Sequence, residues 1–141
     1  MVYYCVRIDD GPDMTAMKDE ALIAAYLLHA TTSTRDGTDA EQLAAFDELQ
    51  ELVWNDPERA WPVICEVLRR ASADDVLAYV AAGPLEDLLV HHPHAFIDRV
   101  ESLAKEEAQF RRAVSGVWGW HSIPDDVRKR LDEVLGNEPR L

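Results

Sequence analysis

Residues 80–89 read Val-Ala-Ala-Gly-Pro-Leu-Glu-Asp-Leu-Leu and join two apolar stripes that have the period of an α-helix. The first stripe consists of Val76, Leu77, Val80 and Ala81, and the second of Leu85, Leu88, Leu89 and His92. Gly83 is expected to end the first helix in a left-handed conformation, and Pro84 suits the first position of the next helix. The stretch therefore predicts a tight corner between two helices, where Gly83→Ala would cost on the order of 1 kcal/mol.

The helical period continues on both sides of this junction. On the second helix, for example, the residues predicted to face the core are Leu43, Phe46, Leu49 and Val53. The predicted helices cover residues 17–30, 40–54, 57–70, 73–82, 84–91, 93–106, 108–116 and 124–135. Only residues 1–13 have the composition of a strand, and they read better as a loose N-terminal extension. The sequence thus predicts an all-α protein with a single helical domain over residues 14–141.

Prolines predicted to open helices recur at positions 57, 93 and 124, which are 36 and 31 residues apart. Intervals of this length are typical of stacked helix pairs of the HEAT or armadillo kind. An irregular helical bundle would give much the same pattern. The fold prediction is therefore a set of stacked short helices, with these two architectures left open.

The charge of the chain is strongly acidic, with 14 Lys and Arg against 27 Asp and Glu and a net charge of −13. Such a field repels phosphate backbones and anionic membrane surfaces, which excludes nucleic acid and membrane as expected partners. It favours either a basic protein partner or merely high solubility.

The two cysteines, Cys5 and Cys65, lack the spacing of a zinc or redox pair and are read as reduced thiols. The N-terminal apolar run is too short for a signal peptide, and the uncharged stretch 21–34 is too short for a membrane helix. These features predict a cytoplasmic protein.

The Ala-Ala-Gly-Pro-Leu-Glu-Asp-Leu-Leu run at residues 81–89 also carries a resemblance. With Ala60-Trp61-Pro62-Val63-Ile64 before it and Phe110-Arg111-Arg112 after it, the chain resembles, over about residues 40–135, an uncharacterised family of small bacterial proteins. The resemblance implies a bacterial, helical protein and carries no activity.

Glu86 and Asp87 are adjacent carboxylates in the predicted first turn after Pro84. Adjacent helical residues point about 100° apart, so a structural role is favoured over an acid–base pair. Asp87 could pair with His91, and Arg111 or Arg112 is the candidate partner for either carboxylate. His91, His92 and His94 form the one metal-like cluster in the sequence, but Pro93 should make their rings diverge.

The candidate partner-binding residues are acidic and aromatic. Glu41, Glu48 and Glu51 are predicted to lie on the solvent side of the second helix. Trp118 and Trp120 flank Gly119, so both cannot easily be buried on one helical face, and an exposed tryptophan is a typical binding anchor.

Two classes of function follow. The favoured hypothesis is a protein-binding module without enzymatic activity or cofactor, possessing an acidic surface for a basic partner, as in immunity-type or adaptor proteins of bacteria. The alternative is a small metal-binding protein or enzyme that uses Glu86, Asp87 and the cluster of His91, His92 and His94.

Overall fold

The computed structural model describes the backbone of residues 14–32 and 40–141, and all of their side chains except those of 14–17, 32, 41 and 42. The predicted all-α fold is confirmed, since these residues form helices and no strand. The α-helices are α1 (Met14–Thr32), α2 (Ala40–Asn55), α3 (Pro57–Arg70), α4 (Asp74–Val80), α5 (Glu86–His91), α6 (Pro93–Glu106), α7 (Ala108–Val114) and α8 (Asp125–Leu135). A π-helical segment, η2 (Ala81–Leu85), joins α4 to α5, and a 3-10 turn, η3 (Trp120–Ser122), precedes α8. The expected N-terminal extension, residues 1–13, lies outside the described residues.

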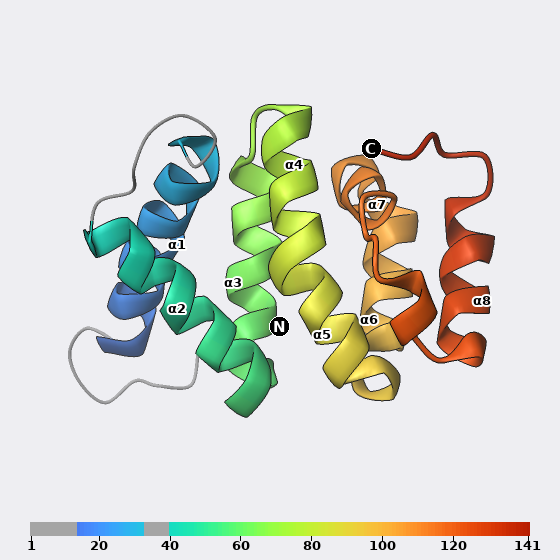
Figure 1. Ribbon diagram of the computed structural model, residues 1–141, viewed down its shortest axis with the longest axis horizontal. Helices are drawn as coiled ribbons and strands as arrows, with labels where there is room; N and C mark the ends of the chain where they lie inside the picture. The colour runs from blue at the N-terminus through green and yellow to red at the C-terminus, as the bar shows by residue number, and fades with distance from the viewer. Residues whose placement is uncertain (1–13, 33–39) are drawn as a thin grey trace.

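The helices stack side by side in chain order from α1 to α8 (Figure 1). Helix α1 packs on α2 and α3, while α6 packs on α7 and α8. The segment from α4 to α5 lies between these groups, because its parts contact α1, α2, α3, α6 and α7. Apolar residues from all eight α-helices meet in one continuous core. None of the helices in the described part of the chain has the length and apolar character needed to cross a membrane.

Prolines open two of the helices as predicted. Pro57 and Pro93 are the first residues of α3 and α6, and Pro124 directly precedes α8. Asp56 directly precedes α3, and its side chain makes no capping hydrogen bond.

The junction at Gly83 and Pro84 differs in part from the prediction. Gly83 has a φ of −107°, so the predicted left-handed conformation is wrong, and with it the reason given for a cost of Gly83→Ala. Pro84 lacks an amide hydrogen, and the Glu86 N–H donates to the carbonyl of Ala81, five residues back. The backbone of Gly83 is not helical (φ −107°, ψ −105°), so two helices meet here at a kink, as predicted, and the turn Ala81–Leu85 joins them.

The buried side of α2 is also shifted relative to the predicted stripe. Leu49 and Val53 are buried as predicted, whereas Leu43 is 49% exposed. The other buried positions of this helix are Ala45 and Leu52, and Phe46 is half-buried. Leu43 therefore lies on the solvent-exposed side of α2, together with the polar residues of this helix.

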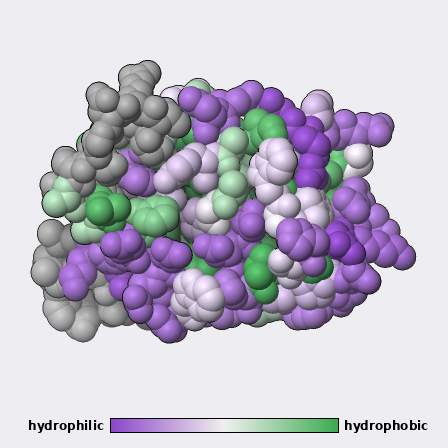
Figure 2. Space-filling model, in the orientation of Figure 1, coloured by the Kyte–Doolittle hydropathy of each residue, from purple (hydrophilic) through white to green (hydrophobic). Residues whose placement is uncertain are grey.

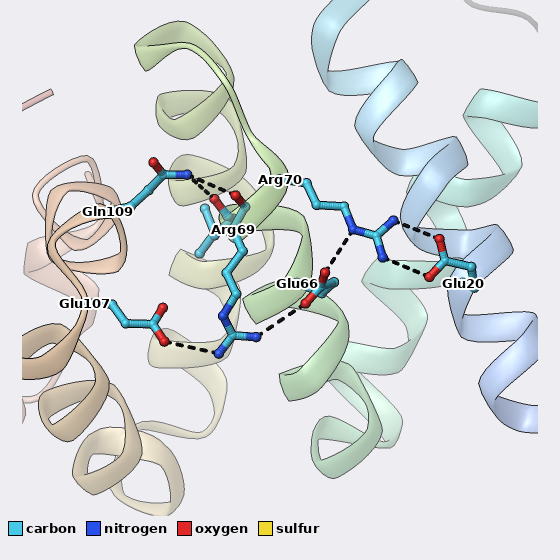
Figure 3. Close-up of polar contacts among 7 residues, drawn as sticks. Glu20, Glu66, Arg69, Arg70, Glu107 and Gln109 are labelled. Carbon is cyan, nitrogen blue, oxygen red and sulfur yellow. Dashed lines mark hydrogen bonds and ion pairs between the residues drawn. The ribbon is translucent and has the colours of Figure 1, made fainter.

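Arginine side chains link neighbouring helices around the end of α3 (Figure 3). Arg70 makes two hydrogen bonds to Glu20 of α1, at 2.8 and 2.9 Å, and a third to Glu66 of its own helix. Arg69 reaches Glu107, at the start of α7, at 3.3 Å. The last turn of α3 is thus tied to the helices on both of its sides.

Similar ion pairs join other helices of the stack. They are Arg59–Asp19 between α3 and α1, Arg99–Glu58 between α6 and α3, Arg112–Asp74 between α7 and α4, and Arg130 with Asp98 and Glu101 between α8 and α6. Each exposed pair contributes little free energy by itself. Most arginines in the described part of the chain therefore form ion pairs that link one helix to another.

Gln109 provides a test of the contact between α3 and α7. Its side-chain amide donates to the carbonyls of Leu68 and Ala71, at 2.6 and 3.0 Å, which would otherwise be free at the helix end. Gln109→Ala should cost about 0.5–1.5 kcal/mol and lower the melting temperature by about 2–4 °C. Glu106→Ala, on the neighbouring exposed turn, is the control, and equal melting temperatures for the two variants would contradict this assignment.

Candidate functional site

Helix α2 presents an acidic surface to solvent. Asp47, Glu48 and Glu51 are exposed, while the side chain of Glu41, the third predicted glutamate, lies outside the described residues. Hydrophilic residues cover much of α2 in the view of Figure 2. A shallow, open depression, called the acidic groove below, lies on this face of α2 and is lined by Asp47, Gln50, Glu51, Trp54 and Asn55.

The carboxylates of this surface have no cationic partner. Helix α2 contains no lysine or arginine, and none of the ion pairs among the described residues reaches Asp47, Glu48 or Glu51. Glu51 accepts one hydrogen bond, at 2.7 Å, from the neutral amide of Asn55. The negative charge of α2 is therefore not neutralised, in contrast to the carboxylates that face arginines between the helices.

Trp54 adds an aromatic group to the same groove. It is 51% exposed, and its ring lies against His91 of α5 with 3.6 Å between the ring centroids. Sequence reasoning did not single out Trp54 as a binding residue. The available signal was its position three residues after Glu51, on the polar side of the predicted helix.

A pocket opens between α2 and the kink of the α4–α5 helix. Its volume is about 240 Å³ including the open mouth. The polar lining residues are Tyr26, Gln50 and Asp87, and the apolar ones are Phe46, Leu49 and Pro84. Because Gln50 also lines the acidic groove, the pocket and the groove form one continuous surface.

The Tyr26 hydroxyl lies in this pocket without a hydrogen-bond partner among the described residues. The residue is 1% exposed, and its ring stacks on Phe46. Burial raises the pKa of the phenol well above its ordinary value, so the hydroxyl stays neutral. A β-carbon placed on Gly83 would lie 3.6 Å from the hydroxyl oxygen. Buried hydroxyl groups normally have a partner, which makes this one a candidate for binding a ligand.

Asp87 lies on the opposite side of the same pocket and is half-buried. Burial raises the pKa of its carboxyl group, the charge of His91 lowers it, and the charge of Glu86 raises it further. The described residues provide no hydrogen bond or ion pair to this carboxylate. The predicted partners Arg111 and Arg112 are wrong, because they pair instead with carboxylates elsewhere, namely Glu138 and Asp74.

Glu86 points away from Asp87 and has a structural contact. Its carboxylate accepts a 3.0 Å hydrogen bond from the backbone N–H of Trp118. The same carboxylate packs on Gly119, where an added β-carbon would lie 2.5 Å from a glutamate oxygen. Glu86 therefore holds the loop between α7 and η3, whereas Asp87 lines the pocket. The two neighbouring carboxylates do not form a pair.

The three clustered histidines also have three different partners. The His91 ring lies on Trp54, the His92 imidazole donates to the carbonyl of Val53 at 2.8 Å, and His94 donates to Asp126 at 2.9 Å. Within the described residues there is no group of three His, Cys, Asp or Glu side chains placed to hold a metal ion. His92 instead fastens the end of α5 to the end of α2.

The two candidate tryptophans differ in exposure. Trp118 is 70% exposed on the loop that Glu86 holds. Trp120 is half-buried against the core, and the guanidinium of Arg140 lies 4.6 Å from its ring centroid. Trp118 is thus available to a partner, whereas Trp120 belongs mainly to the packing.

Taken together, the fold and the site define a small protein of stacked helices with an acidic groove and an adjoining pocket, and without an assembled catalytic group among the described residues. The chain belongs to the family of unknown function DUF6869, which matches residues 33–138. Comparisons with curated proteins and with solved structures gave no match.

The contact of Glu86 with Gly119 can be tested by a double-mutant cycle. Gly119→Ala should destabilise the protein by about 0.5–1.5 kcal/mol, because the methyl group would displace the Glu86 carboxylate and break its hydrogen bond from the Trp118 N–H. In the background of Glu86→Ala, the same glycine substitution should cost much less. Thermal melts of the four proteins measure the coupling, and additive losses would contradict the close contact.

Asp87→Asn should stabilise the protein at neutral pH. A carboxyl group whose pKa is raised in the folded state disfavours folding once it is ionised, and asparagine removes that charge. We expect a gain of about 1–3 °C in melting temperature at pH 7. The gain should vanish below the ordinary pKa of aspartate, where both states are protonated.

Asp132→Asn, at an exposed position of α8, is the matched control and should give no such gain. A lower melting temperature for Asp87→Asn would mean that the carboxylate stabilises the fold.

Proposed function

We propose that this protein is a binding module that receives a basic protein partner on the acidic groove of α2. One observation carries the proposal: none of the ion pairs among the described residues includes Asp47, Glu48 or Glu51, while arginines neutralise carboxylates between the other helices. A cationic surface is the chemical complement of such a groove.

The groove combines two features of protein interfaces. Its unpaired carboxylates create a field that accelerates the encounter with a basic surface, and this effect weakens as salt is added. Trp54, half-exposed within the same groove, offers the kind of aromatic group that supplies binding energy at contact. Trp118 is a second exposed anchor, on the loop after α7.

Immunity-type and adaptor proteins of bacteria are the classes that this arrangement suits, and a cytoplasmic location goes with them. The metal-binding or enzymatic alternative has less support, because His91, His92 and His94 contact separate partners. The thiol of Cys65 is buried, and burial raises its pKa to about 12, so it is not a reactive thiolate at neutral pH.

The experiment is a pull-down from the native host with three immobilised proteins. These are the wild type, a variant with Glu41, Glu48 and Glu51 changed to lysine, and a control variant with Glu106, Asp132 and Glu133 changed to lysine. The control residues are exposed and lie outside the ion pairs of the described residues, and both variants change the net charge equally. Melting curves establish that all three proteins are folded.

The proposal predicts that a basic protein is retained by the wild type and by the control and is lost from the α2 variant. Its release from the wild type should occur at moderate salt, because exposed charges are screened over about 8–10 Å. Recovery of the same proteins by all three baits, with the same salt tolerance, would refute a binding role for the α2 surface.

A further inference from the structure

We propose that the pocket between α2 and the α4–α5 kink seats the primary ammonium group of a lysine side chain from the partner. This inference rests on the proposed function and specifies its chemistry: the acidic groove attracts a basic surface, and the pocket selects one lysine of that surface. The argument uses the size of the pocket, its lining and its place beside the groove.

The size of the pocket suits one side chain. Apart from its open mouth, its volume is about 30 Å³, which is room for one or two groups of the size of a water molecule, such as the ammonium end of a lysine. The rings of Phe46 and Pro84 and the side chain of Leu49 supply apolar walls. A lysine has four methylene groups that can lie along such walls while its charged end goes deeper.

The polar lining complements an ammonium ion. An ammonium group has three donors and no acceptor, and the Tyr26 hydroxyl, the Asp87 carboxylate and the Gln50 carbonyl can all accept. The Tyr26 hydroxyl is buried and has no hydrogen-bond partner among the described residues, so it is free to accept a hydrogen bond from an ammonium group. None of the residues that line the pocket is a lysine or arginine.

A compact ammonium ion fits this arrangement better than a guanidinium ion. The guanidinium group of arginine is planar and binds a carboxylate best through two parallel hydrogen bonds. It also has five N–H donors that need acceptors. In this pocket the acceptors belong to three separate side chains on α1, α2 and α5. The three acceptor groups on these separate side chains equal in number the three donors of a lysine ammonium.

The surroundings of the pocket also favour a cation that belongs to a partner protein over a free small cation. Gln50 lies at the boundary between pocket and groove, so a lysine in the pocket would bring its neighbouring residues over Glu51 and Trp54. Glu86, next to Asp87 in the chain, adds negative charge to the pocket, as its effect on the pKa of Asp87 shows. Binding a cation would relieve the unfavourable burial of the Asp87 charge.

The test is a titration with n-butylammonium chloride, a mimic of the lysine side chain, followed by two-dimensional NMR of the full-length protein. Sodium chloride at equal concentration, n-butanol and n-butylguanidinium are the comparison titrants. The variants are Asp87→Asn, Tyr26→Phe and the control Glu51→Gln, which removes one charge from the groove and leaves the pocket unchanged. Spectra and melting curves before titration establish that each variant is folded.

We expect saturable shifts of the Gly83 backbone amide and the Gln50 side-chain amide in the wild type with n-butylammonium, and weaker binding of n-butylguanidinium. Asp87→Asn should weaken the affinity by about tenfold or more, and Tyr26→Phe by about 3–10-fold, since each removes an acceptor. Glu51→Gln should stay within about twofold of the wild type, because an exposed charge contributes little.

The pocket proposal fails if n-butanol gives the same shifts as n-butylammonium, if no saturable shift occurs, or if Asp87→Asn binds as the wild type does. Because this titration needs no partner protein, its outcome is independent of the pull-down. If the titration fails but the pull-down still depends on the α2 glutamates, the lysine pocket is refuted and the acidic binding surface stands.

Discussion

The missing amide hydrogen of Pro84 is the constraint on which the arrangement of this protein depends. Together with the non-helical backbone of Gly83, it interrupts the helix at the centre of the stack and leaves a kink within the turn Ala81–Leu85. The kinked helix contacts helices on both sides of the stack, so the bend affects all of them. It also places Gly83 and Pro84 in the wall of the pocket, with Asp87 one turn further on.

The distribution of arginines determines which acidic residues remain for a partner. Arg59, Arg70 and Arg99 join α3 to its neighbours, and Arg112 and Arg130 do the same for α7 and α8. Helix α2 has no basic residue and receives none from the described residues, so it is packed through apolar contacts and the hydrogen bond from His92. The same division of charge that stabilises the stack therefore leaves the carboxylates of the α2 surface and of Asp87 outside the ion pairs of the described residues.

The helices could be predicted closely from apolar periodicity and from the prolines at 57 and 93, because both signals are local. The form of the kink could not, since a glycine before a proline suits a helix end as well as a π-helical turn, and packing decides between them. The exposure of Glu48 and Glu51 also followed from the pattern. The pocket did not, because Tyr26, Gln50 and Asp87 come from three helices that only the folded chain brings together.

The most direct measurement of this account is an NMR titration of the side-chain carboxyl carbons with pH. The account predicts that Asp87 titrates above the ordinary pKa of aspartate, because it is buried without a cation. Asp74 and Glu101 should titrate below their ordinary values, because they accept hydrogen bonds from Arg112 and Arg130. A pKa of Asp87 at or below the ordinary value would show that the chain itself neutralises this carboxylate, and would contradict a site held open for a cation.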